Sequence, residues 1–148
     1  MKKTTILISI LFVSVSALCQ NPVHWSFSAK KIKEGCYEVH LTATVDPPWH
    51  TYSQTTPDGG PLPTKISFSK NPLITPAGKT AEKGKLVTEH DKVFEVDVKY
   101  FDGDVDFVQV FNVKGNAHTA VNGRIEYMAC KDQQCLSPQT IPFNIKLP

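Results

Sequence analysis

The feature that most constrains the fold is an alternation of apolar and polar residues along the chain. From Tyr37 to Val45 every odd position is apolar, and every even position, from Glu38 to Thr44, is polar. A period of two places one face of a β-strand on a core and the other face in water. We expect further strands at 25–29, 94–100, 105–113, 124–129 and 141–147.

The spacing of these segments predicts the fold class. No segment shows a sustained apolar period of 3.6 residues, and many short strands at intervals of about ten residues are typical of an all-β, antiparallel β-sandwich. A chain of 148 residues is long enough for one such domain. We therefore expect a single domain over residues 20–148.

Two turns and two loops are expected between the strands. Asp102-Gly103 predicts a tight hairpin, and Asn122-Gly123 predicts a second turn or a bulge. Pro47 to Pro63 is rich in proline and reads as a long ordered loop or an edge segment. Thr75 to Lys92 is polar and is expected to be an exposed loop with a short strand at most.

Residues 1–19 resemble a secretory signal peptide. Lys2 and Lys3 supply the positive start, and Ile6 to Ala17 is an apolar run too short to span a bilayer. Small residues at Ala17 and Cys19 predict cleavage between Cys19 and Gln20. A buried N-terminal helix, or a lipoprotein acylated at Cys19, are the alternatives.

The net charge argues against nucleic acid as a partner. Without Lys2 and Lys3 the chain has 14 Lys and Arg against 14 Asp and Glu. A surface that binds nucleic acid through its phosphates needs an excess of positive charge, and here the basic residues are scattered.

The motif with the clearest chemistry is Cys130-Lys-Asp-Gln-Gln-Cys135. Four intervening residues let the chain fold back until the two sulfurs meet. Closing so short a loop restricts the unfolded chain little, by roughly 2 kcal/mol, so a purely stabilising bridge would gain more by joining distant strands. A reversible thiol–disulfide couple and a structural hairpin bridge both remain open on the spacing alone.

No metal or organic cofactor is expected. The cysteine spacing is not that of common zinc sites, and there is neither a haem attachment motif nor a G-x-S-x-G nucleophile motif. Copper bound by Met128 and some of the histidines is a minor alternative (His24, His40, His50, His90 and His118). Cys36 lies on the polar face of its strand by parity, either exposed or packed as a small apolar residue, and we assign it no role.

Two stretches resemble a known family. One is Gly123 to Cys130 followed by Cys135-Leu-Ser-Pro138, and the other is Pro48 to Ser53 followed by Gly60 to Thr64. Together they resemble the N-terminal periplasmic domain of the thiol:disulfide interchange protein DsbD, over residues 22–147. The resemblance implies an immunoglobulin-like β-sandwich with a redox-active cysteine pair near one end.

The resemblance also implies roles for particular residues. Cys135 would form the mixed disulfide with a partner, and Cys130 would be the resolving thiol. Tyr52, with Trp49 and Tyr127, would shield the pair from water, which raises the pKa of a thiol. Ordinary core packing is the alternative for these aromatic residues.

The family also has a cap loop, often with an aromatic tip, that covers the disulfide. The corresponding stretch here, within 79–92, lacks an aromatic residue, and Phe94 fits a strand. Leu86 and Val87 would then be the residues that cover the disulfide.

The expected function is that of a protein-disulfide reductase component in the periplasm. Electrons would pass from a membrane-embedded donor, through Cys130 and Cys135, to thioredoxin-fold proteins. Because the chain stops at Pro148, where the family protein continues, we expect a stand-alone relative or one that needs separate partners. The alternative is a non-catalytic, exported immunoglobulin-like binding module in which the disulfide only pins a hairpin.

Overall fold

The computed structural model describes residues 21–148 except residues 93 and 116. The predicted signal peptide and its cleavage site at Cys19-Gln20 lie outside the described residues. None of the described residues form a helix with the length and hydropathy that a membrane span requires.

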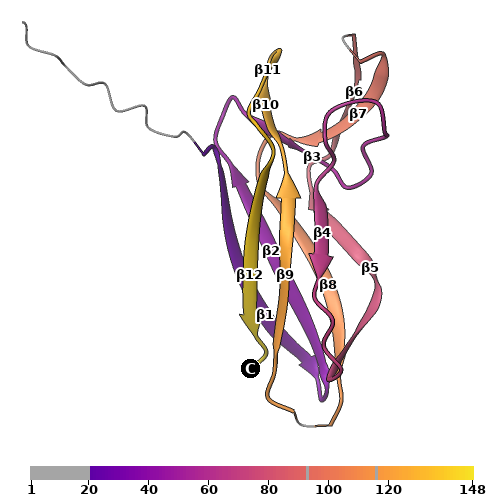
Figure 1. Cartoon of the computed structure of the whole chain (residues 1–148), viewed down its shortest axis with the longest axis vertical. Helices are drawn as coiled ribbons and strands as arrows, with labels where there is room; N and C mark the ends of the chain where they lie inside the picture. Colours follow the sequence, from indigo (N-terminus) through magenta and orange to yellow (C-terminus); the bar gives the residue numbers. More distant parts are fainter. Residues whose placement is uncertain (1–20, 93, 116) are drawn as a thin grey trace, which may run out of the picture.

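The described chain is folded into antiparallel strands (Figure 1). In chain order these are β1 (Val23–Lys33), β2 (Cys36–Val45), β3 (His50–Tyr52), β4 (Lys65–Phe68), β5 (Ile74–Gly84), β6 (Val87–Asp91), β7 (Val96–Phe101), β8 (Val105–Val113), β9 (Ala120–Tyr127), β10 (Ala129–Lys131), β11 (Gln134–Cys135) and β12 (Gln139–Lys146).

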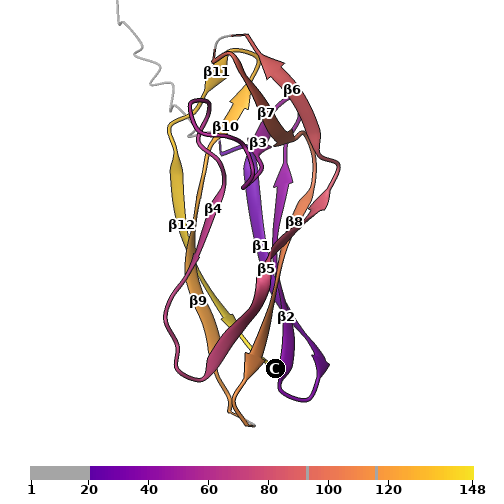
Figure 2. The ribbon, with the colours of Figure 1, turned by 90° about the vertical axis from the view of Figure 1, so that its right-hand side faces the viewer.

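The strands form an immunoglobulin-like sandwich with a third sheet at one end. A four-stranded sheet of order β1-β2-β8-β5 faces a three-stranded sheet of order β12-β9-β4 (Figure 2). The five-stranded sheet, β11-β10-β3-β7-β6, lies beyond the ends of β9 and β4. The prediction of a single all-β domain is confirmed.

The core lies between the two sandwich sheets and explains the alternation of β2. Its odd positions, from Tyr37 to Val45, are all buried against side chains from the opposite sheet, such as Ile125 and Phe143. Burial of these apolar side chains supplies the main driving force for the fold, at about 25 cal/mol per Å² of apolar surface.

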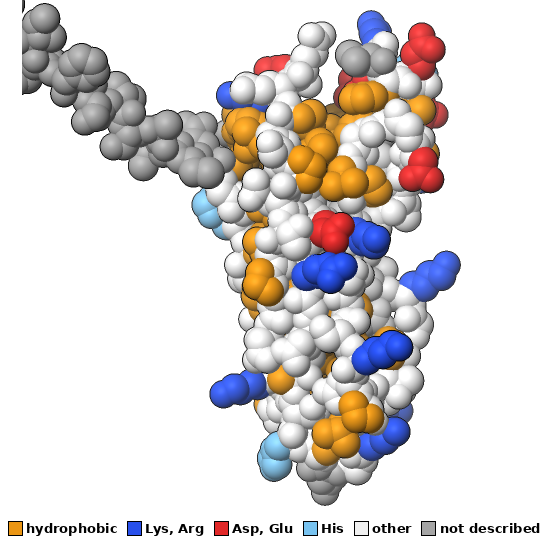
Figure 3. Space-filling view, viewed as in Figure 1, with side chains coloured by type: hydrophobic (Ala, Val, Ile, Leu, Met, Phe, Trp, Pro, Cys, Tyr) orange, Lys and Arg blue, Asp and Glu red, His pale blue; other side chains and the backbone are white. Residues whose placement is uncertain are grey.

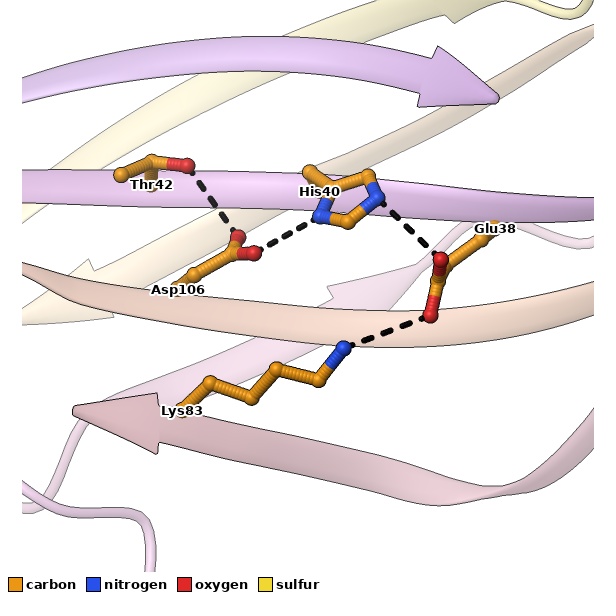
Figure 4. A network of polar contacts seen from close by, with 5 residues as sticks. All are labelled: Glu38, His40, Thr42, Lys83 and Asp106. Atoms are coloured by element: carbon orange, nitrogen blue, oxygen red, sulfur yellow. Dashed lines mark hydrogen bonds and ion pairs between the residues drawn. The ribbon is translucent and has the colours of Figure 1, made fainter.

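The even positions of β2 form a polar network on the outer face of the four-stranded sheet (Figure 4). Nδ1 of His40 lies 2.7 Å from Asp106 on β8, and the Thr42 hydroxyl donates to the same carboxylate at 3.1 Å. Nε2 of His40 lies 3.5 Å from Glu38, which also pairs with Lys83 on β5 at 3.4 Å. These contacts tie three neighbouring strands together on their water-facing side.

The expectation of a loop at Thr75 to Lys92 is wrong, because β5 and β6 occupy most of it. β5 is an edge strand with a register shift between Ala77 and Ala81. Gln109, buried on β8, fills this irregularity. Its amide donates to the carbonyls of Ala77 and Gly78, and its oxygen accepts from Thr80. β5 is therefore held in place by a side chain of β8, and its own sequence has no alternating apolar pattern.

Two turn predictions are also wrong. Asn122-Gly123 lies inside β9, paired with Asn144 and Phe143 of β12. Asp102-Gly103 does not close a hairpin, because β7 and β8 belong to different sheets. Position 123 requires glycine for packing and not for a turn, because a Cβ there would collide with the Phe143 ring and the Ser67 carbonyl.

We expect Gly123→Ala to lower the free energy of unfolding by about 1–3 kcal/mol, because the added methyl overpacks the contact between β9, β4 and β12. Gly103→Ala is the matched control, since a Cβ at Gly103 meets nothing within 4 Å. Urea denaturation measures both. Equal stability of the two variants would contradict this account of Gly123.

Candidate functional site

The candidate site is built on the five-stranded sheet at the end of the sandwich (Figure 1). Within it β10 lies between β11 and β3, with Cys130 opposite Cys135 on one side and opposite His50 on the other. On the far side of β3, Tyr52 is opposite Tyr100 of β7. Residues opposite each other in an antiparallel ladder project from the same face, so all five side chains share one face of the sheet.

Cys130 and Cys135 form a disulfide with their Cα atoms 4.1 Å apart. The two cysteines face each other across a hairpin whose turn is Asp132-Gln133, with Asp132 in the left-handed region at φ 49°. Cys130 is only 1% exposed, whereas Cys135 is exposed. Another protein can therefore reach the sulfur of Cys135 and not that of Cys130.

The buried sulfur sits in a small apolar cluster. Cys130, Tyr52 and Val98 are buried together, with Val96, Tyr100 and Met128 packed against them. In Figure 3 hydrophobic side chains gather at this end of the molecule, below the two projecting hairpins. This cluster is separate from the main core, so the sheet has one face on the sandwich and one face around the disulfide.

Aromatic rings line the floor of this site. The His50 ring lies 4.5 Å from the Tyr100 ring, and its Nε2 lies 3.0 Å from the Tyr52 hydroxyl. The Tyr100 hydroxyl in turn donates to Glu89 at 3.0 Å. These contacts hold the rings in fixed orientations beside Cys130.

Burial sets the charge states of these groups. It raises the pKa of Tyr52 to about 12, with smaller contributions from Asp91 and Tyr100, so this hydroxyl keeps its proton at neutral pH. Burial lowers the pKa of His50 below its usual value, against the opposite effect of nearby carboxylates. The site is therefore lined by uncharged rings.

Buried hydroxyl groups hold β3 against its surroundings. The Thr51 hydroxyl donates to the Met128 carbonyl at 3.0 Å, and the Thr64 hydroxyl donates to the Tyr52 carbonyl at 2.5 Å. The Ser53 hydroxyl donates to Glu82 at 2.7 Å. We did not predict these positioning residues. Their signal in the sequence is that Thr51, Ser53 and Thr64 lie in the stretches that carry the family resemblance.

The loop after β3 folds back over the same face. A Cβ at Gly60 would come within 3.0 Å of Val96 and 3.7 Å of Val98, so the backbone there passes close to the apolar cluster. Thr64 anchors the end of this loop to Tyr52. The stretch Gly60 to Thr64 therefore covers the cluster beside the disulfide.

Of the three predicted shielding residues, the structure brings Tyr52 to Cys130 and places the other two in the main core. Trp49 is buried and has the Lys131 ammonium 4.8 Å from its ring centroid. Tyr127 is buried, and its hydroxyl donates to Asn21 at 3.1 Å. Beside Tyr127 a cavity of about 30 Å³ reaches Ala129 and Leu136, which is room for roughly one water.

Phe94 lies in the turn between β6 and β7 and not in a strand, so that expectation is wrong. Glu95, with φ at 56°, ends the alternation that would have extended β7 backwards. The Phe94 backbone N–H donates to the Asp91 side chain, and the residue is 43% exposed. The β6–β7 turn lies at the same end of the molecule as β10 and β11. Leu86, which precedes β6, is also exposed.

The remaining candidate residues pair with nearby side chains or pack locally. His24 pairs with Asp46 and His90 with Asp97, both on the surface. Among residues 21–148, leaving out 93 and 116, no three His, Cys, Asp or Glu side chains gather as a metal site requires. Cys36 is a free thiol, 8% exposed, so it is packed rather than edge-exposed.

A family model described as "Thiol:disulfide interchange protein DsbD, N-terminal" matches residues 16–146. The match spans nearly the whole chain and includes both cysteines and the stretch around Tyr52. The resemblance found in the sequence is thus confirmed. No curated protein sequence matches the chain significantly.

Two solved structures share the fold. The N-terminal periplasmic domain of ScsB from Proteus mirabilis superposes with a TM-score of 0.60 and 14% identity, over 88% of this chain and 48% of that chain. The DsbD N-terminal domain from Neisseria meningitidis, in the reduced form, gives 0.55 and 11%, over 84% of this chain and 85% of that one. The chain thus spans about half the length of the ScsB domain. At these identities the likeness concerns the fold alone.

Proposed function

The chain belongs to the family of DsbD N-terminal domains, and from this membership we propose that it carries out thiol–disulfide exchange in the periplasm. The observation that carries the proposal is the unequal exposure of the pair. A buried and an exposed sulfur lie opposite each other on one hairpin, which suits a couple that reacts with partners through one sulfur only.

The exchange proceeds in two steps. The Cys135 thiolate attacks a disulfide of the partner, and one partner sulfur leaves with the electron pair, giving a mixed disulfide. Cys130 then attacks the Cys135 sulfur, and the second partner sulfur leaves. The partner gains two electrons and two protons and becomes a dithiol, while Cys130 and Cys135 become the disulfide seen here.

The partners follow from the family. Thioredoxin-fold proteins are the acceptors, and a membrane-embedded donor reduces the disulfide again by the reverse steps. The two sulfurs carry the electrons by themselves, so the scheme needs neither a metal nor an organic cofactor.

Tyr52 shields the pair within this scheme. Its ring packs directly on Cys130, while Trp49 and Tyr127 support the other face of the same sheet. Excluding water there slows reduction by small thiols, because attack at the exposed Cys135 must release Cys130 as a thiolate, which is poorly solvated in an apolar site.

The scheme predicts which cysteine can be trapped. The bait is a thioredoxin-fold protein that keeps only its exposed active-site cysteine, activated with thionitrobenzoate. Cys130→Ser should form a stable mixed disulfide with it through Cys135, because the resolving thiol is missing. Non-reducing electrophoresis and mass spectrometry identify the linkage.

Cys135→Ser and Cys36→Ser are the controls for this trap. Cys135→Ser should give little complex, and Cys36→Ser should behave as the unmodified chain, forming a complex that resolves. Failure of both Cys130→Ser and Cys135→Ser to capture the bait would rule out the exchange function.

Shielding by Tyr52 predicts a change in the rate of reduction. Tyr52→Ala should let dithiothreitol reduce the disulfide several-fold faster, whereas Tyr52→Phe, which keeps the ring, should differ little from the unmodified chain. Stopped-flow fluorescence measures the rates, and circular dichroism checks that both variants fold. Equal rates for Tyr52→Ala and the unmodified chain would remove Tyr52 from the shielding role.

A further inference from the structure

Given the proposed function, on which this inference rests, the buried sulfur of Cys130 must meet one chemical requirement. Cys130 must lose its proton before it can attack the mixed disulfide, since the thiolate is the nucleophile. With 1% of its surface exposed, it cannot hand that proton directly to bulk water. A neighbouring group that accepts protons, and that itself reaches the surface, would remove this obstacle.

His50 occupies the required place. It is directly opposite Cys130 across the β3–β10 ladder, which puts the two Cβ atoms about 4.5–5.5 Å apart on the same face. Its ring is half-buried, so it keeps contact with solvent and can exchange protons there. No other histidine lies on β3, β10 or β11.

The contacts of the ring leave one nitrogen available. Nε2 is engaged with the Tyr52 hydroxyl at 3.0 Å, and the edge-to-face contact with Tyr52 and the packing on Tyr100 fix the ring plane. Within the described part of the chain, Nδ1 has no hydrogen-bond partner. A neutral imidazole accepts a proton at one nitrogen while the other keeps its hydrogen bond.

The charged groups around the ring also fit this role. Four carboxylates are near enough to favour its charged form: Glu89 and Asp91 from β6, Asp102 after β7, and Asp132 in the β10–β11 turn. Lys131 is directed to Trp49 on the opposite face. Burial keeps the ring neutral at rest by lowering its pKa, and the carboxylates stabilise the imidazolium once a proton arrives.

We propose that His50 is the proton acceptor for Cys130. As the resolving step begins, the Cys130 S–H bond breaks and the proton moves to the imidazole. The thiolate bonds to the Cys135 sulfur, the bond between Cys135 and the partner breaks, and the partner sulfur leaves as a thiolate. The imidazolium then returns its proton through solvent to that thiolate. In the reverse direction it protonates Cys130 as the disulfide opens.

The resolving step can be timed by itself with Ellman's reagent. Reduced protein reacts first at the exposed Cys135 and releases one thionitrobenzoate. Attack by Cys130 then releases a second one, in a phase whose rate does not depend on reagent concentration. Cys130→Ser should show the first phase alone, which identifies the second and also reports any contribution of Cys36.

His50→Phe preserves an aromatic ring but cannot accept a proton. We expect it to slow the second phase by about tenfold or more near pH 7, with the first phase little changed. Its rate should climb about tenfold per pH unit, as expected when hydroxide must remove the proton, while the unmodified protein levels off at a lower pH. His50→Gln is polar but not basic, and it should show the same slow second phase and pH dependence. It replaces His50→Phe in the test if that variant does not fold.

His118→Phe is the matched control, because His118 is exposed on the β8–β9 connection at the far end of the molecule. It should leave both phases unchanged. An unaltered second phase and pH profile in both His50 variants would overturn the proposal. Ellman's reagent takes the place of a partner protein, so the result for His50 does not depend on whether Cys135 traps the bait. The proposal for His50 and the proposed exchange function can therefore fail separately.

Discussion

The pairing of β10 with β3 is the interaction on which the site depends. This short ladder joins segments far apart in the chain and places Ala129 opposite Thr51 and Cys130 opposite His50. A slip of one residue would turn Cys130 toward the sandwich core and Ala129 toward the disulfide face. The Thr51 hydroxyl, bonded to the Met128 carbonyl, fixes the register from inside the sheet, where no water competes for it.

From that register the chemistry of the site follows. The central strands of the five-stranded sheet, β10, β3 and β7, bury apolar side chains on both faces, whereas antiparallel sheets commonly have one solvated face. One face completes the sandwich core through Phe101, Ala129 and Trp49, and the other buries one sulfur of the disulfide under Tyr52. Stability and reactivity therefore use opposite faces of the same strands. The rigid sandwich holds the hairpin in place while Cys135 remains accessible.

The sequence could predict the elements whose pattern is local. The sequence predicts β2 because its odd-numbered residues are apolar and are buried in the core. The spacing from Cys130 to Cys135, with its flanking motifs, indicates the cysteine pair. The sequence does not predict β5, because its irregular backbone is supported by Gln109, a side chain of β8 that lies far away in the chain. Gly123 was misread as a turn because the close approach of Phe143 is invisible without the third strand. The place of His50 beside Cys130 likewise depends on a long-range register that no local pattern encodes.

The reduction potential of the Cys130–Cys135 couple tests the central claim most directly, and equilibration with glutathione or dithiothreitol buffers followed by mass spectrometry would measure it. An exchange couple should have a potential above about −300 mV, in the range of redox proteins that pass electrons among themselves. A value well below about −300 mV would mean that the bridge stays closed under physiological reductants. The hairpin disulfide would then be structural, and the domain a binding module.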